Sequence, residues 1–121
     1  MKQWERDPPI MMSEILSQLK ALSDETRLTI FKLVQQRELC VCQIVPAIGL
    51  SQPTVSAHLG KLKRAGLVKE RRVRPWSHYS ADEDGVARFR RQLDTFLAAG
   101  LLDLPETREL VRALPPPCVP E

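Results

Sequence analysis

Two cysteines, Cys40 and Cys42, flank one valine in the stretch ELCVC, in a chain that has three cysteines in all. Thiolates are soft ligands that select soft metals and metalloids. Alternate residues of an extended segment face the same way, so both sulfurs can point to one side while Val41 points to the other. The residues alone leave two interpretations open. The thiols bind a soft metal or metalloid, or both cysteines are small core residues.

A short helix is expected over residues 42–48, with Gly49 as its C-cap, so the two thiols lie on its approach and at its start. The positive end of a helix dipole favours a thiolate there. The remaining thiol, Cys118, lies in the proline-rich segment PPPCVPE. A flexible tail of this length spans about 20 Å, so Cys118 can reach the other two as a third sulfur. The alternative is an incidental tail residue.

Helical periodicity and capping signals predict helices over residues 10–19, 24–36, 42–48, 52–65 and 86–101. Ser23 or Asp24 is the expected N-cap of the second, and Ser51 that of the fourth. Val55, Leu59 and Leu62 form the inward stripe of the fourth helix. The stretches LVKERRV and WSHYSA predict two strands joined by a tight turn at Arg74-Pro75, with Trp76 packed in the hairpin.

This order of elements predicts a mainly α fold with a small β-hairpin wing, a winged helix-turn-helix. We expect an N-terminal tail over residues 1–9, one DNA-binding and dimerisation domain over 10–102, and a proline-rich tail over 103–121 in which Pro105 starts a brief helix. The first and last helices of the domain carry more apolar surface than its core needs. We therefore expect two chains to dimerise through them.

Charge is concentrated in the predicted DNA-binding unit. Seven basic residues stand against the single acid Glu70 between residues 51 and 80, although the net charge of the whole chain is only +3. The polar leading end of the fourth helix would read bases in the major groove, and Gln52 can pair bidentately with adenine. The candidate DNA-binding residues are Gln52, Thr54, Ser56, Ala57, Lys61, Lys63, Arg64, Arg71, Arg72 and Arg74, the basic ones suiting phosphates or a minor groove.

Other classes of protein fit the sequence less well. An odd number of cysteines argues against a disulfide framework, and we expect a cytoplasmic protein without a signal peptide or a membrane-spanning segment. A small thiol oxidoreductase would need C-x-x-C in a strand-helix context, whereas the spacing here is C-x-C, so we expect no enzyme and no catalytic cofactor. A winged-helix module that binds only proteins would not need the basic block.

The stretches ALSDETRLTIFKLV, ELCVC, LSQPTVSAHLGKLKRAGLV and RRVRPWSHYS resemble the ArsR/SmtB family of repressors, and its arsenic-sensing branch in particular. The resemblance covers about residues 12–97. It implies a homodimer that binds double-stranded operator DNA and leaves it when arsenite or antimonite is bound. In that branch the ELCVC cysteines are the metalloid ligands, which carries over to Cys40 and Cys42.

The sequence departs from the family's patterns at three points. Arsenic sensors have a third cysteine where this chain has Val45, and the cadmium and lead sensors have cysteines near the N-terminus, where this chain has none. Zinc sensors use histidines and carboxylates on the last helix, where this chain has acids but no histidine, and His58 and His78 lie in the DNA-binding unit instead. The resemblance thus favours a thiophilic metalloid over zinc and leaves the third ligand open, a place that the remaining thiol of this chain, Cys118, could fill. The alternative inducers are an organoarsenical, cadmium or lead.

Overall fold

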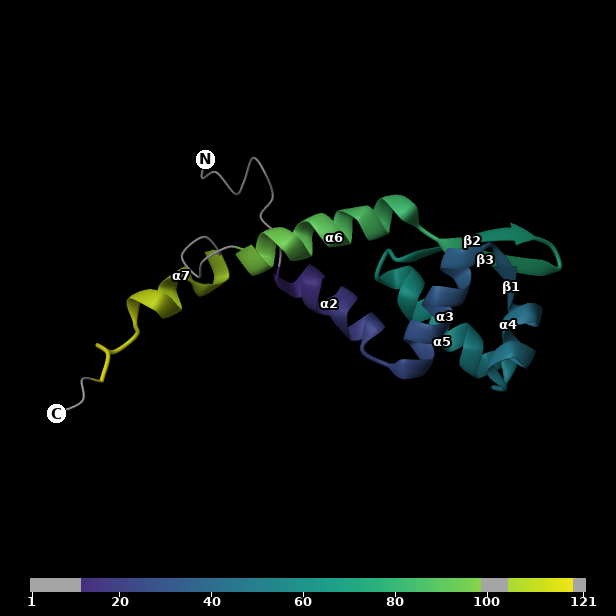
Figure 1. Ribbon diagram of the computed structural model, residues 1–121, viewed down its shortest axis with the longest axis horizontal. Coiled ribbons are helices and arrows are strands. Elements are labelled where there is room, and N and C mark those ends of the chain that lie inside the picture. Colours follow the sequence, from purple (N-terminus) through teal and green to yellow (C-terminus); the bar gives the residue numbers. More distant parts are fainter. Residues whose placement is uncertain (1–11, 99–104, 119–121) are drawn as a thin grey trace.

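The computed structural model describes residues 12–98 and 105–118. Figure 1 shows the elements in chain order. They are α2 (Met12–Leu22), α3 (Glu25–Gln36), β1 (Leu39–Cys40), α4 (Val41–Ile48), α5 (Gln52–Arg64), β2 (Val68–Val73), β3 (Trp76–Ala81), α6 (Glu83–Ala98) and α7 (Pro105–Arg112). The fold is a mainly helical winged helix-turn-helix, as expected. The predicted tail at 1–9 and the domain end at 99–102 lie outside the described residues.

The helices start and stop where the capping residues indicate. Asp24 accepts a hydrogen bond from the backbone N–H of Arg27 and caps α3, and Ser51 accepts one from Thr54 and caps α5. Gly49 ends α4 in the left-handed region, at a φ of 80° that favours glycine. The turn between α4 and α5 is therefore tight, and the two helices form the helix-turn-helix unit.

The wing is a three-stranded antiparallel sheet, so the expectation of a two-stranded hairpin was incomplete. The strand order is β1-β3-β2, and the turn at Arg74-Pro75 joins β2 to β3 as predicted. The extra strand is β1, which pairs Leu39 with Tyr79 and Cys40 with His78. Two residues are too few for an alternating pattern, so this strand left no signal in the sequence. It ties the cysteine segment to the wing.

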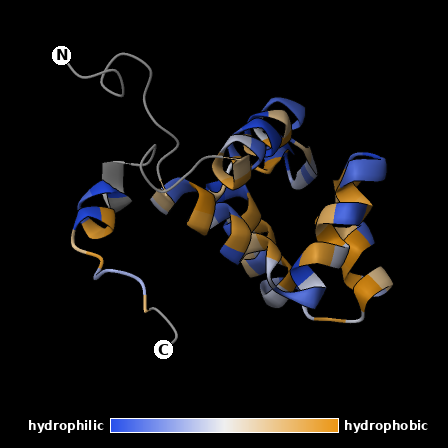
Figure 2. Cartoon of the chain, turned by 60° about the vertical axis from the view of Figure 1, so that its left-hand side comes forward, coloured by the Kyte–Doolittle hydropathy of each residue, from blue (hydrophilic) through white to orange (hydrophobic). Residues whose placement is uncertain are grey.

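The core lies where α3, α4, α5 and the sheet meet. Val55, Leu59 and Leu62, the predicted inward stripe of α5, are all 0% exposed. In Figure 2 the helical ribbons carry orange and blue residues in turn, as amphipathic helices do. Within the described part of the chain, no helix has the length and apolar character needed to cross a membrane.

The two ends of the domain come together outside this core. Helix α6 runs beside α2 (Figure 1), and the two helices are in contact. Leu16 and Leu19 on α2 remain 48% and 40% exposed, and Leu97 on α6 is 73% exposed. The excess apolar surface that the sequence predicted on these two helices is therefore present.

Candidate functional site

The sulfurs of Cys40 and Cys42 lie 2.6 Å apart, with the Cys42 thiol donating to Cys40 Sγ. Cys40 ends β1 and is buried, whereas Cys42 lies in the first turn of α4 and is exposed. Neither forms a disulfide. A single small soft atom could therefore bridge both sulfurs without a large movement of the backbone.

The Cys40 sulfur is also the N-cap of α4. It accepts a hydrogen bond from the backbone N–H of Cys42 at 3.3 Å, while Gln43 Oε1 accepts one from the Cys40 N–H at 2.8 Å. These reciprocal bonds form a capping box with sulfur in place of the usual oxygen. Pro46 lies inside the same helix and has no N–H to donate to the carbonyl of Cys42. The first turn of α4 therefore depends strongly on its cap.

The protonation of these thiols differs from the expectation. A thiolate was expected at the start of α4, but the pKa of Cys42 is raised. The main cause is the hydrogen bond to Cys40, in which the Cys42 proton is shared, and partial desolvation adds to it. The raised pKa favours the protonated form of Cys42, contrary to the expected thiolate.

The structure does not bring Cys118 to the other two cysteines. Cys118 is exposed beyond α7, and within residues 12–98 and 105–118 no group of three His, Cys, Asp or Glu side chains is close enough to hold one metal ion. The expectation that Cys118 supplies a third sulfur stays a prediction.

A cavity of about 460 Å³ opens beside the two cysteines. Val41 and Val45 of α4 form part of its wall, and the wing contributes Pro75, Trp76 and Tyr79. Trp76 is 53% exposed, so the expectation that it packs within the hairpin was wrong. The wing leaves this indole at the edge of the cavity.

The same cavity reaches the residues expected to read DNA. Gln52 and Ser56 of α5 line it together with the cysteines. Gln52, Thr54, Ser56 and Ala57 are all exposed along the leading end of α5, as the helical wheel predicted. A molecule bound at the thiols would thus lie within reach of Gln52 and Ser56.

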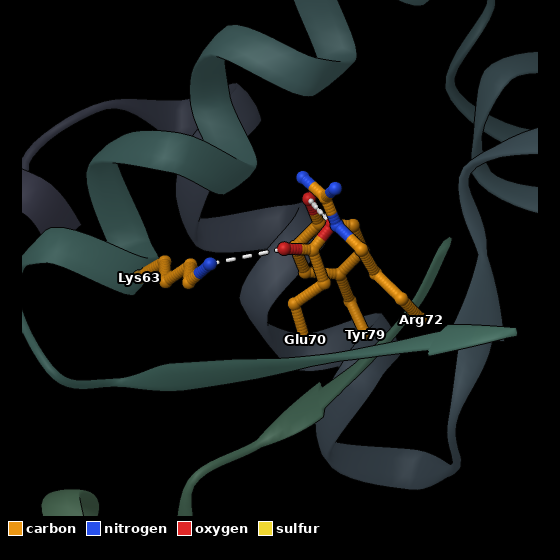
Figure 3. Close-up of polar contacts among 4 residues, drawn as sticks. All are labelled: Lys63, Glu70, Arg72 and Tyr79. Carbon is orange, nitrogen blue, oxygen red and sulfur yellow. Dashed lines mark hydrogen bonds and ion pairs between the residues drawn. The ribbon is translucent and has the colours of Figure 1, made fainter. Parts of the chain in front are cut away.

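Several of the expected phosphate contacts are already paired with carboxylates. Glu70 on β2 accepts hydrogen bonds from Lys63 of α5 at 2.9 Å and from Tyr79 at 3.1 Å (Figure 3). Arg72 Nε lies 3.5 Å from the same carboxylate, whose side chain is 9% exposed. The bonds from Lys63 and Ser77 lower the pKa of Glu70 to about 2. Glu70 therefore stays ionised and joins the recognition helix to the wing.

A second carboxylate, Glu38, accepts hydrogen bonds from two of the three guanidinium nitrogens of Arg71, Nε and Nη2. This hydrogen bond lowers the pKa of Glu38 and raises that of Arg71. Sequence reasoning counted Glu70 only as a charge and passed over Glu38. The alternation of β2 gives a hint for Glu70, which lies opposite the buried Tyr79. Lys61, Arg64 and Arg74 are exposed and form no ion pair within the described part of the chain, so they remain free for phosphates.

Comparison with known proteins agrees with this geometry. Residues 24–70 match the family described as bacterial regulatory protein, arsR family. The chain is 46% identical over 61 residues to the arsenical resistance operon repressor of Escherichia coli, covering 50% of this chain and 52% of that protein. It is 39% identical over 74 residues to a cadmium resistance regulatory protein, a CadC homolog, of Staphylococcus aureus, covering 60% of this chain and 61% of that protein. The matches thus span little more than half the length of these two relatives.

A solved structure extends the similarity to a larger share of the chain. It is the homodimeric winged helix-turn-helix DNA-binding domain of a possible ArsR-family transcriptional regulator from Mycobacterium bovis. The identity is 30% and the TM-score 0.61, with 81% of this chain and 87% of that one covered.

Proposed function

The chain belongs to the arsR family of bacterial regulatory proteins and is a DNA-binding transcriptional regulator rather than an enzyme, and from this premise we propose that trivalent arsenic or antimony is its inducer. The protein represses transcription from an operator in double-stranded DNA and releases it when the metalloid binds. It works as a homodimer in the cytoplasm. The exposed leucines of α2 and α6 support the dimer, as does the homodimeric relative from Mycobacterium bovis.

One observation carries this proposal: the paired thiols of Cys40 and Cys42 lie in one cavity with Gln52 and Ser56. Thiolates suit trivalent arsenic and antimony, which are soft acceptors. Two candidate ligands lie 2.6 Å apart, and two candidate base readers line the same cavity. A metalloid bound by the cysteines therefore has to act only across this one cavity to affect the candidate base readers.

Release follows from the dual role of the Cys40 sulfur. A metalloid bound to this sulfur competes with the backbone N–H of Cys42, which the sulfur caps. Loss of an N-cap costs about 0.5–2 kcal/mol, and Pro46 leaves the first turn of α4 with few other bonds to hold it. The turn at Gly49 passes the displacement to α5. A coupling of about 1–3 kcal/mol is enough for substantial release.

The test is operator release measured by fluorescence anisotropy, on a duplex selected from a randomised library. Cys40→Ser and Cys42→Ser should each bind the operator with affinity close to that of the parent and fail to release it when arsenite is added. Cys118→Ser tests whether Cys118 supplies the third sulfur. It should lower arsenite sensitivity if Cys118 supplies the third sulfur, and leave it unchanged if it does not. Normal release from Cys40→Ser would show that the inducer binds elsewhere.

The DNA contacts are tested separately from the inducer. Gln52→Ala and Ser56→Ala should weaken operator binding by about 1–3 kcal/mol and relax the sequence preference. Arg74→Ala should weaken binding to any duplex and lower the salt slope by about 1. Arg71→Ala should lower it less, because Glu38 already neutralises that guanidinium. Unchanged affinity in the Gln52 and Ser56 variants would overturn the recognition-helix assignment.

A second inducer class has one observation in its favour. The similarity to the cadmium resistance regulator of Staphylococcus aureus is close to that found for the arsenic repressor. Cadmium and lead are also thiophilic, but they prefer three or four ligands, whereas two thiols are paired here. Release by Cd²⁺ or Pb²⁺ at lower concentrations than arsenite would favour this alternative.

A further inference from the structure

We propose that the preferred inducer is a trivalent arsenical with one carbon substituent, R–As(OH)₂, whose substituent occupies the cavity beside Cys40 and Cys42. This inference rests on the proposed function and names the ligand class within it. It starts from the number of ligands that the site offers. Two sulfurs are paired at 2.6 Å, and the described part of the chain adds no third His, Cys, Asp or Glu to them.

The chemistry of R–As(OH)₂ matches two thiols. The arsenic has two exchangeable hydroxides and one retained carbon bond. Each thiol forms an As–S bond as one As–O bond breaks, and its proton leaves with the displaced hydroxide as water. Two thiols thus yield R–As(S-Cys)₂ and two waters. Arsenic stays trivalent throughout, so the step needs no oxidant or reductant.

The cavity has the size and the walls that a substituent needs. Its volume of about 460 Å³ lies in the range of about 300–1,000 Å³ that is typical of small-molecule sites. Arsenic and its sulfurs alone would leave most of it empty. Val41, Val45 and Pro75 supply apolar surface next to the thiols. A hydrophobic group bound there is removed from water, which adds affinity that arsenite cannot gain.

The aromatic residues at the cavity indicate which substituents fit best. Trp76 lines the cavity and is 53% exposed, although a large aromatic side chain gains most when it is covered. A planar aromatic substituent can pack on its ring. Glu70 also lines the cavity, but Lys63 and Tyr79 already bind its carboxylate (Figure 3). The wall therefore presents no unpaired charge to an apolar group.

The position of the substituent also strengthens release. Gln52 and Ser56 line the cavity from α5. A group that extends from the thiols into this space contacts the residues expected to read DNA. Binding of the substituent and binding of the operator then compete for the same surface, which adds to the effect of uncapping α4. We therefore expect an aryl arsenical to be the stronger inducer as well as the tighter ligand.

The experiment compares three probes: phenylarsine oxide, which hydrates to the aryl form of R–As(OH)₂, methylarsenous acid and arsenite. The parent for this test is Trp4→Phe, which leaves Trp76 as the single tryptophan and keeps all three cysteines, so that arsenite can still use Cys118 as a third ligand. The phenyl probe should bind at least about tenfold more tightly than arsenite, since even small apolar groups give such ratios in apolar pockets. Binding should change the emission of Trp76, and operator release should follow the same order.

Two variants locate the substituent. Trp76→Ala, followed by operator release, should bring the ratio between phenyl probe and arsenite close to one while arsenite itself still acts. Val45→Phe, which fills the cavity from α4, should do the same by a different route. A ratio that persists in both variants would show that the substituent lies elsewhere, and this would overturn the inference.

The outcomes separate this inference from the proposed function. If arsenite releases the operator as well as or better than the phenyl probe, the inference fails and the proposed function stands. The double variant Cys40→Ser with Cys42→Ser should respond to none of the probes. If it responds as its parent does, the inducer site is misplaced and both fail.

Discussion

Gly85, in the first turn of α6, lies in direct contact with Gly66, which follows the recognition helix α5. A side-chain carbon on Gly85 would lie 1.9 Å from the carbonyl oxygen of Gly66. Gly66 itself adopts a φ of 78°, a left-handed conformation that favours glycine. The first turn of α6, the helix expected to form the dimer, therefore packs against the segment that follows α5, the helix expected to read DNA. At this contact no side chain separates the two backbones.

This contact predicts that Gly85→Ala is destabilising. The methyl group meets backbone atoms that cannot rotate away, and such overpacking costs about 1–3 kcal/mol. Gly60→Ala is the matched control, because its nearest neighbour is the flexible end of Arg64 at 3.4 Å. That change should raise stability by about 0.8–1 kcal/mol, the difference in helix propensity between the two residues. Urea unfolding measures both, and equal stabilities for the two variants would contradict the contact.

The exposed leucines predict where the dimer forms. Leu97→Glu and Leu16→Glu should each give monomers that keep their helical circular dichroism but bind the operator weakly. Leu97 is 73% exposed in the single chain, so a charge there leaves the core intact. Leu93 is a poorer probe because it packs partly against the core.

Sedimentation at micromolar concentration measures the assembly, with Leu28→Glu as the control. Leu28 is 45% exposed on α3, which is not one of the two helices expected to form the interface, so this variant should remain dimeric. If Leu97→Glu sediments as the parent does, the dimer interface lies on another surface.

Much of the fold could be predicted from local signals. Ser51 and Gly49 bound the recognition helix and the helix before it because capping depends on residues close in the chain. The buried stripe of Val55, Leu59 and Leu62 follows from helical periodicity alone. The same periodicity places Gln52 and Ser56 on the opposite, exposed face of α5.

The features that could not be predicted from the sequence depend on contacts that local sequence patterns do not encode. The strand at Leu39–Cys40 exists because it pairs with β3, which lies about forty residues further along the chain. Glu70 appeared as a lone acid among basic residues, whereas the fold places Lys63 and Tyr79 on its carboxylate. The raised pKa of Cys42 depends on a proton shared with Cys40, which spacing could not reveal.

Glu70 predicts a defined dependence of stability on pH. Its pKa is lowered to about 2 in the folded chain from 4.5, so the folded state holds the carboxylate more strongly than the unfolded state does. This stabilisation is fully present above about pH 4.5 and is lost as the pH falls towards 2. Glu70→Gln should lower stability at pH 7 by about 1.5–3 kcal/mol, the range for hydrogen bonds to charged groups.

Urea unfolding of both proteins across this pH range checks the sign. The difference between the parent and Glu70→Gln should shrink as the pH falls from 4.5 to 2. Glu109→Gln is the control, since the Glu109 side chain is 79% exposed and its ion-pair partner, Arg112, is 68% exposed, so that this ion pair lies in solvent. A difference that grows towards low pH would contradict the assignment of Glu70 as an ionised link between helix and wing.

The shared proton between Cys40 and Cys42 predicts how the inducer site titrates. In a Cys118→Ser background, Cys40→Ala leaves Cys42 as the single thiol and removes the sulfur that accepts its proton. The pKa of Cys42 is raised mainly by that hydrogen bond, so it should fall in this variant. The pH midpoint for alkylation of Cys42 by iodoacetamide, followed by peptide mass, should move down accordingly. Cys40→Ser keeps an acceptor and should give a smaller shift. An unchanged or higher midpoint in Cys40→Ala would mean that the hydrogen bond to the Cys40 sulfur does not raise the pKa of Cys42, and the assignment of that bond as the main cause would then be wrong.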